Sequence, residues 1–300
     1  MTFHRISAFF LALSALAIVV CTALLIYPGP KFSIEFTGGT LMSVQLPAGK
    51  TKEDLSKVVS GFKTTSGAVL GNFSISSVRG LEGGSSFVIR MRPLNNDEHV
   101  ALLANVTKTF PGTQELQFNT IGPSVSANLK QRTFVALGVA SICIIMYLAF
   151  AFRKLPRKLS PWKFGLLAVI AFIHDVIITA GVFLVLGWYT SFEFDTLFVT
   201  ALLTILAYST NDTIVIFDRV RANLSFENRS EDFATTAIRG LKDSLMRTMG
   251  TGISTLIMLT ALFFLGAESI RWFILALIFG IVIGTYSSYF IASALLIRWK

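Results

Sequence analysis

Six apolar runs of about 20 residues each set the strongest limit on how this chain can fold. A helix of this length spans the hydrocarbon core of a bilayer. The runs cover residues 6–27, 133–152, 164–187, 195–217, 248–266 and 270–297. Only 14% of the 300 residues are charged, whereas soluble domains average about 25%. We therefore predict an α-helical polytopic membrane protein with six transmembrane helices.

Basic residues predict how these spans are oriented. Lys and Arg accumulate in the cytoplasmic loops of membrane proteins. Here bases gather between the second and third runs, between the fourth and fifth, and after the sixth, whereas residues 188–195 contain none and residues 266–271 contain one. We therefore expect both termini in the cytoplasm and a cytoplasmic loop at 218–247. Because topology accounts for the net charge of +9, nucleic-acid binding is not expected.

The segment 28–130, between the first and second runs, is polar and long enough for a small extracytoplasmic domain. Alternation, capping and turn signals predict, in order, a strand at 32–46, a helix at 51–65, strands at 72–79 and 86–92 around a turn at 82–84, a helix at 96–110 and a strand at 113–121. This order is that of the split, ferredoxin-like βαββαβ unit. We expect this α+β domain to separate the first transmembrane helix (1–27) from a five-helix transmembrane domain (131–300). Its one histidine, His99, has no pattern around it that indicates catalysis.

Polar side chains inside the apolar runs are the candidates for function. Insertion scales put the cost of an Asp or Arg at a helix centre at about 3 kcal/mol, so such residues are functional candidates by default. The third run contains His174 and Asp175, and the fourth contains the polar segment 208–213. Arg247 lies at the start of the fifth run. Cys21 and Cys143 lie inside apolar runs and indicate neither a disulfide nor a metal site.

The helical rise of about 1.5 Å per residue assigns each candidate a depth. Asp212 lies roughly 8 Å inside the cytoplasmic end of the fourth span, and Arg247 lies in about the first turn of the fifth. These two opposite charges can meet if the helices are neighbours. Asp175, about 12 residues into the third span, lies nearer the middle of the membrane. Ser209 and Asp212 share one helix face.

Each candidate also has a structural interpretation. Arg247 could be an interfacial base that reaches the headgroups, and His174 could be a hydrogen-bond donor between helices. Asp212 is harder to explain in this way, because Asn or Ser would serve a structural role without burying a charge. Burial favours the neutral form of a carboxyl group and a nearby Arg favours the charged form, so such a group is poised for reversible protonation. A proton-driven transporter requires a group of this kind.

The sixth run contains packing signals as well as hydroxyl groups. Gly280 and Gly284 form a G-x-x-x-G face that permits close helix contact, and we assign it a structural role. The hydroxyls of residues 285–289 either line a polar path or bond across helices. The residues that we expect along a polar transmembrane path are His174, Ser209, Asn211, Thr213, Tyr286 and Ser287.

Taken together, these motifs resemble those of the SecF family, the smaller membrane subunits of bacterial SecD–SecF protein-export complexes. The resemblance covers essentially the whole chain and depends on the segments 36–40, 121–125, 174–175, 208–219, 247–248 and 284–288. Two positions depart from the family pattern. Glu35 stands where the family usually has Asp, and Ala207 stands where it usually has Gly.

The resemblance implies a subunit of a proton-driven complex of the resistance-nodulation-division superfamily, in the bacterial cytoplasmic (inner) membrane. The implied partners are SecD, the SecYEG channel, YajC and exported unfolded preproteins. Carried over by position, Asp212 and Arg247 are the expected proton-coupling residues, with Asp175 as a third candidate. Neither an enzyme activity nor a metal is implied, and the only coupling agent is the proton. The chain has no phosphate-binding glycine loop of the Walker type.

Two other classes of function compete with this interpretation. The first is half of a proton-driven transporter of lipids or small molecules from the same superfamily. Such exporters usually need two large external domains, and about 100 residues are too few to build a substrate tunnel. The second is an intramembrane aspartyl protease that uses Asp175 and Asp212. That chemistry requires two carboxyl groups that share one proton, whereas these two are expected at different depths.

Overall fold

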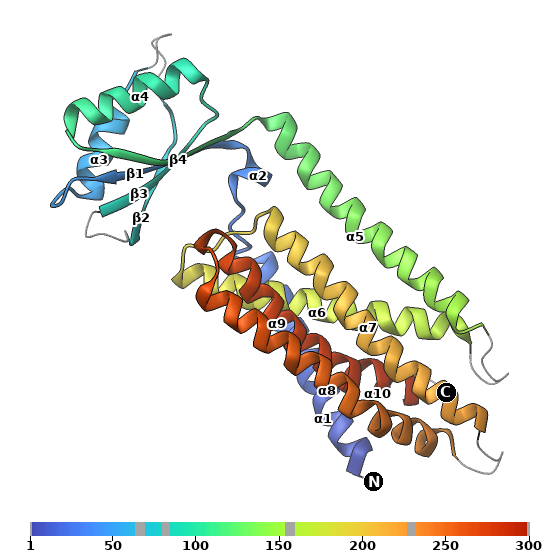
Figure 1. The fold of residues 1–300 in the computed structure, drawn as a ribbon. Coiled ribbons are helices and arrows are strands. Elements are labelled where there is room, and N and C mark those ends of the chain that lie inside the picture. Colours follow the sequence, from blue (N-terminus) through green and yellow to red (C-terminus); the bar gives the residue numbers. More distant parts are fainter. Residues whose placement is uncertain (1, 64–69, 80–84, 154–159, 227–231, 299–300) are drawn as a thin grey trace. The chain divides into compact units, whose positions relative to one another are not determined.

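The computed structural model describes residues 2–63, 70–79, 85–153, 160–226 and 232–298. The chain forms two compact units, one of residues 1–31 with 134–300 and the other of residues 32–133. The first unit is a bundle of long helices, and the second combines short helices with one sheet (Figure 1). The turn expected at 82–84 lies outside the described residues, as does most of the basic segment that follows residue 153.

Six helical stretches among the described residues are long and apolar enough to cross a membrane, one for each predicted run. They are α1 (Thr2–Ile26), α5 (Pro123–Ala151), α6 (Pro161–Tyr189), α7 (Thr196–Phe226), α8 (Phe233–Leu265) and a last stretch made of η1 (Glu268–Ile270), α9 (Arg271–Ser287), η2 (Ser288–Ala292) and α10 (Ser293–Arg298). The turn η2 is π-helical, a departure from α-helix that often accompanies functional sites. The prediction of a multi-pass helical membrane protein is confirmed.

The segment expected as a cytoplasmic loop at 218–247 is helical over most of its described length. α7 continues to Phe226 and α8 begins at Phe233. Hydropathy marks the point at which a helix leaves the apolar layer, but a helix satisfies its own backbone hydrogen bonds and can continue into water. On the extension of α7, Asp218 and Arg221 form a 2.7 Å ion pair one turn apart, which favours the helix.

α9 packs closely against α7 because glycines leave no side chains at the contact. A Cβ atom on Gly280 would collide with the side chain of Ile205, and one on Gly284 would lie 3.1 Å from the Cβ of Ser209. Residues four apart lie about one turn apart on a helix, so successive turns of α9 pack on successive turns of α7. The structural role predicted for the two glycines is confirmed.

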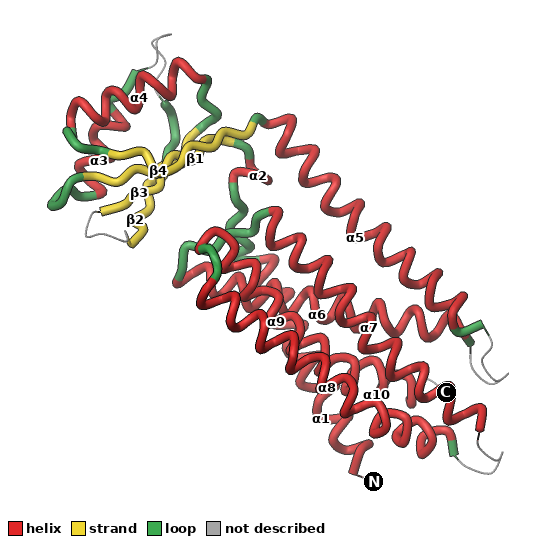
Figure 2. Tube along the Cα trace, viewed as in Figure 1, coloured by secondary structure: helices red, strands yellow, loops and turns green. Residues whose placement is uncertain are grey.

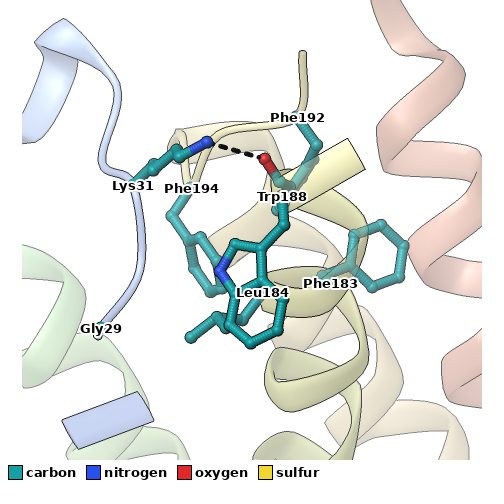
Figure 3. Close-up of a pocket in the computed structure, with 8 residues that line it drawn as sticks. Gly29, Lys31, Phe183, Leu184, Trp188, Phe192 and Phe194 are labelled. Atoms are coloured by element: carbon teal, nitrogen blue, oxygen red, sulfur yellow. Dashed lines mark hydrogen bonds between the residues drawn. The ribbon is translucent and has the colours of Figure 1, made fainter. Parts of the chain in front are cut away.

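Aromatic rings fill the end of the bundle at which α6 ends and α7 begins. The centroids of the Phe183, Phe192 and Phe198 rings lie 4.9 to 5.2 Å apart. Lys31 donates a 3.0 Å hydrogen bond from Nζ to the carbonyl oxygen of Gly187 (Figure 3), and a cation is favourable at this C-terminal end of α6. The crevice that Lys31, Phe183 and Phe192 help to line has a volume of only about 10 Å³, which is room for a single water molecule. We therefore regard this end of the bundle as structural packing.

The second unit contains one four-stranded antiparallel sheet. Its elements are α2 (Ile34–Thr37), β1 (Gly39–Leu46), α3 (Lys52–Ser60), β2 (Ser74–Arg79), β3 (Ser85–Met91), α4 (Asn96–Thr109) and β4 (Gln114–Ile121). The strands lie in the order β2-β3-β1-β4, and every neighbouring pair is antiparallel. From β1 onward the elements follow the predicted order of strand, helix, strand, strand, helix, strand.

The alternation of the strands places one face of this sheet against α3 and α4 (Figure 2). Met42 and Val44 of β1 are buried with Leu55 of α3 and with Leu102 and Val106 of α4. The unit therefore has a hydrophobic core of its own, separate from the apolar contacts within the helical bundle.

The prediction of a strand at 32–46 is wrong for its first half. Residues Ile34–Thr37 form the short helix α2, because the side chain of Ser33 caps its N-terminus by accepting a hydrogen bond from the backbone of Glu35. β1 begins only at Gly39, and the positive φ angles of Gly38 and Gly39, 72° and 124°, are accessible mainly to glycine.

A reciprocal cap and an ion pair stabilise the start of α4. The side chain of Asn95 accepts a hydrogen bond from the backbone of Glu98, and the Glu98 carboxylate accepts one from the backbone of Asn95. That carboxylate also accepts two hydrogen bonds from the guanidinium of Arg92, at 2.6 and 3.1 Å. The bonds from Arg92, together with the backbone bond from Asn95, hold the pKa of Glu98 below its usual range.

His99 has a structural partner that its sequence context did not indicate. Its Nε2 atom lies 2.7 Å from Oε1 of Glu115, and its ring stacks on Phe118 at a centroid distance of 3.6 Å. Both partners belong to β4, so this contact attaches α4 to the edge strand of the sheet.

Replacement of Gly280 by Ala tests the packing of α9 on α7. We expect Gly280→Ala to lower the free energy of unfolding by about 1–3 kcal/mol, because the added methyl group overpacks against Ile205. Gly250→Ala on α8 is the matched control, since a Cβ there meets no atom within 4 Å and Ala is the better helix former. Thermal unfolding in detergent measures both variants. Equal melting temperatures for the two would contradict the close contact.

Replacement of Glu98 by Gln tests the start of α4. We expect Glu98→Gln to destabilise the second unit by about 1–2 kcal/mol, a range that allows for the partial solvent exposure of Arg92. Hydrogen exchange of α4 and β4 amides in the full-length protein measures the effect. Glu53→Gln is the control, because Glu53 occupies the first turn of α3 and is exposed.

The same pair predicts a pH dependence. Because the folded-state pKa of Glu98 lies below its unfolded-state value, the stabilisation is present above the ordinary glutamate value of about 4.3 and is lost as the pH falls through the folded-state value. The difference in exchange between Glu98→Gln and the parent should therefore shrink as the medium is acidified below about pH 4. A difference that stays constant would exclude the ionised carboxylate as its source.

Candidate functional site

The polar segment 208–213 lies in the middle of α7 without interrupting the helix. Four of its side chains are buried within the bundle, namely those of Ser209, Thr210, Asp212 and Thr213. Ser209, Asp212 and Thr213 recur at intervals of three and four residues and therefore point to one side of α7. That side meets α9, since Gly284 leaves space for Ser209 and the hydroxyl of Ser288 on η2 lies 2.9 Å from that of Thr213.

Asp212 is 1% exposed and has a hydroxyl group as its hydrogen-bond partner. Thr285 of α9 donates from Oγ1 to Oδ2 of Asp212 at 3.2 Å. Within the part of the chain that the structure describes, no cation lies within ion-pair distance of this carboxyl group. Tyr208 extends beside it toward α8, where a Cβ on Gly252 would lie 3.3 Å from the tyrosine hydroxyl and 3.7 Å from Oγ1 of Thr285.

Asp175 of α6 is fully buried and more heavily bonded than Asp212. Its Oδ2 atom accepts hydrogen bonds from Ser209 at 2.7 Å and from Ser287 at 2.9 Å. Its Oδ1 atom lies 2.9 Å from Nδ1 of His174. The carboxyl group therefore joins three helices, α6, α7 and α9, at one point.

The two buried acids are close in the network but are not bonded to each other. Ser209, which bonds Asp175, lies one helical turn from Asp212 on the same face of α7. Among the described residues no hydrogen bond joins the two carboxyl groups. An aspartyl protease pair must share one proton, so this arrangement does not provide its geometry. The described residues also contain no group of three His, Cys, Asp or Glu side chains that could hold a metal ion.

Arg247 lies on the exposed side of α8. α7 and α8 are neighbours, as the predicted meeting with Asp212 requires. The buried side of α8 at this level, however, carries Ser244 and Thr248. The structure therefore does not bring Arg247 to Asp212, and no ion pair between them occurs in the described chain.

The residues expected along a polar path separate into two groups. Ser209, Thr213 and Ser287 are buried and bonded, as described above, and His174 is buried beside Asp175. Asn211 instead lies on the exposed side of α7. Its position follows from the helical period, because Asn211 lies two residues from both Ser209 and Thr213, about 200° around the helix from each, and so points away from them.

Two contacts at this site were not predicted from the sequence. Thr285 was recognised only as part of a motif, yet it is the donor to Asp212. Ser14 of α1 lies 2.9 Å from the hydroxyl of Tyr286, which also donates to the carbonyl oxygen of Phe10. The sequence does contain a pattern that could have predicted the second contact. Ser7 and Ser14 are polar residues seven apart, and so on one face, in a mostly apolar helix.

Comparison with known proteins agrees with the resemblance of the motifs. The family model described as "Protein export membrane protein SecD/SecF, C-terminal" matches residues 101–300. A protein translocase subunit SecF from Thermobaculum terrenum is 37% identical over 295 residues, which make up 98% of this chain and 92% of that protein. The protein translocase subunit SecDF of Thermus thermophilus is 33% identical over 297 residues, 98% of this chain but only 37% of the longer protein.

Comparison with solved structures points to the same family. The crystal structure of SecDF from Thermus thermophilus, named a translocon-associated membrane protein, matches this structure with a TM-score of 0.82 at 30% sequence identity. The match covers 100% of this chain and 38% of that chain, so the chain corresponds to somewhat more than a third of the fused protein. With a family model over 200 of its 300 residues and relatives along nearly all of its length, the chain belongs to the SecF family of protein translocase subunits.

Proposed function

We propose that this chain is an accessory subunit of the Sec translocase that, together with SecD, uses the proton gradient to promote late steps of preprotein translocation. The relatives named as translocase subunits support the export role. The observation that carries the proton-driven part is Asp212, a carboxyl group buried in a membrane-spanning helix with no cation beside it among the described residues.

Asp212 has the surroundings that a reversible proton carrier needs. Its bond from the Thr285 hydroxyl can form with either protonation state, because a hydroxyl both donates and accepts. Within the described chain, binding of a proton therefore breaks no ion pair. A proton that crosses the membrane releases about 2.3 kcal/mol per 100 mV of potential, which is enough to bias an equilibrium between two conformations.

Asp175 is the second candidate, and its role differs from that of Asp212. Hydrogen bonds from Ser209, Ser287 and His174 occupy both of its oxygens. Its protonation would change the contacts of three helices together. We assign proton entry to Asp212 and the response of the surrounding helices to Asp175.

We assign Arg247 a role at the interface with SecD. Its exposed position on α8 leaves the guanidinium accessible to a carboxyl group of a partner. The fused SecDF relative supports SecD as that partner. The SecYEG channel, YajC and unfolded preproteins complete the proposed assembly, on the basis of the family resemblance.

The placement in the cell follows from charge and fold. We place the chain in the bacterial inner membrane. The distribution of bases supports an orientation with both termini in the cytoplasm and residues 28–130 outside it. For the external domain we propose the ferredoxin-like class, which the element order and the strand order β2-β3-β1-β4 support. A transporter of lipids or small molecules is not favoured, since the relatives are named as translocase subunits.

Replacement of Asp212 by Asn tests the proton carrier. We expect Asp212→Asn to abolish the acceleration of preprotein export by the proton gradient, because the amide keeps the shape of the side chain but cannot take up a proton. Export of a secreted protein in cells that retain SecD measures this effect. Asp218→Asn, on the exposed extension of the same helix, is the control and should export normally. Normal export by a stably inserted Asp212→Asn protein would refute the proposal.

Replacement of Arg247 by Met tests the interfacial cation. We expect Arg247→Met to slow the same export step severalfold, because an exposed charge that faces a partner acts through that partner. Lys242→Met is the matched control, as it removes another exposed base from α8. If both variants export at the parental rate, Arg247 is an ordinary interfacial base that reaches the headgroups.

A further inference from the structure

The buried side of α1 is unusual in its chemistry. Among the described side chains of this helix, the buried ones are those of Ser7 and Ser14, which are 1% and 4% exposed. Large apolar side chains such as Leu16 and Val19 face outward instead. Between membrane helices, small residues allow close approach and a hydroxyl can form an interhelical hydrogen bond. The polar side of α1 is therefore its contact side.

Ser14 and Tyr286 form a directed link from α1 to α9. The Tyr286 hydroxyl donates to the carbonyl oxygen of Phe10 at 3.1 Å and lies 2.9 Å from Oγ of Ser14. A phenol has one proton, so when Tyr286 donates to Phe10 it accepts from Ser14. The rings of Phe10 and Tyr286 also meet edge to face, with centroids 5.5 Å apart. One side chain of α9 thus holds both the backbone and a hydroxyl of α1.

Tyr286 also lies near the buried histidine of α6. Its ring stacks with that of His174 at a centroid distance of 6.1 Å and an interplanar angle of 30°. His174 is bonded to Asp175 through Nδ1, while its buried Nε2 atom has no hydrogen-bond partner among the described residues. The ring of Tyr286 therefore lies near a histidine that hydrogen bonds restrain, among the described residues, through Nδ1.

Three consecutive residues of α9 connect these groups. Thr285 bonds Asp212, Tyr286 holds α1 and stacks on His174, and Ser287 bonds Asp175. Successive residues of a helix point about 100° apart, so one turn of α9 contacts α7, α1 and α6 at the same time. A shift of this turn necessarily changes the contacts of both acids and of α1 together.

We propose that Tyr286 is a positioning residue that transmits the protonation state of the buried acids to α1 through Ser14. The proposal rests on the proton-driven function proposed above and names its transmission path. α1 is the helix whose end leads, through residues 27–31, into the external domain that begins at residue 32. Because the two are joined by so few residues, a movement of α1 would be passed directly along the chain to the external domain.

Replacement of Ser14 by Ala tests this link in the full complex with SecD. Export into inverted membrane vesicles and proton uptake, followed with a pH-sensitive dye, are measured on the same preparation. We expect proton uptake near the parental level and a fall of about threefold or more in export per proton, in line with the loss of one interhelical hydrogen bond of about 0.6–1.7 kcal/mol. Tyr286→Phe should show the same fall in that ratio, and Ser14→Ala combined with Tyr286→Phe should be no worse than either alone.

Two further variants separate transmission from general packing. Ser14→Thr keeps the hydroxyl and should restore export per proton. Tyr289→Phe makes the same chemical change three residues after Tyr286, but removes a contact with Ser244 of α8, so its ratio of export to proton uptake should stay at the parental value.

Parental export by Ser14→Ala, or a parallel fall of export and proton uptake, would overturn the proposal. Absence of proton uptake by the parental complex, or its persistence in Asp212→Asn, would overturn the proposed function itself.

Discussion

The close approach of α9 to α7 is the contact on which the membrane site depends. Gly280 and Gly284 bring the two backbones close enough that short side chains reach across the interface. The Thr285 hydroxyl would not otherwise span the gap to Asp212. Packing and chemistry are therefore inseparable here, because the absence of two side chains lets this hydroxyl group meet the buried acid of α7.

The network also explains how two acids can occupy an apolar environment in different ways. Asp175 is surrounded by donors from three helices, so it acts as a junction of the bundle. Asp212 has a single hydroxyl donor and no cation at hand in the described chain. A tightly bonded acid stabilises one arrangement of helices, whereas a sparsely bonded one can change its protonation at low structural cost. The π-helical turn η2 directly follows Ser287, so the helix is irregular next to the junction.

The second unit could be predicted closely because its signals are local. Thr51 and Asn95 each form a capping box with an acid three residues later, and both helices begin at these positions. Alternation located the strands to within one or two residues, apart from the start of β1. There Ser33 caps a short helix that the alternation pattern does not reveal. The partner of His99 also escaped prediction, since Glu115 lies on a different element.

For the membrane unit, the sequence by itself determined the six spans and the identity of the buried acids, because hydropathy and the cost of a charge in an apolar layer are local properties. It also determined that Ser209 and Asp212 face the same way, since the helical period relates them. Only the tertiary structure decided which neighbour that face meets. The rotation of each helix depends on packing with other helices, and this placed Arg247 and Asn211 on exposed surfaces and Ser14 against Tyr286. Helix ends beyond the apolar layer were likewise decided by backbone hydrogen bonding, which hydropathy does not report.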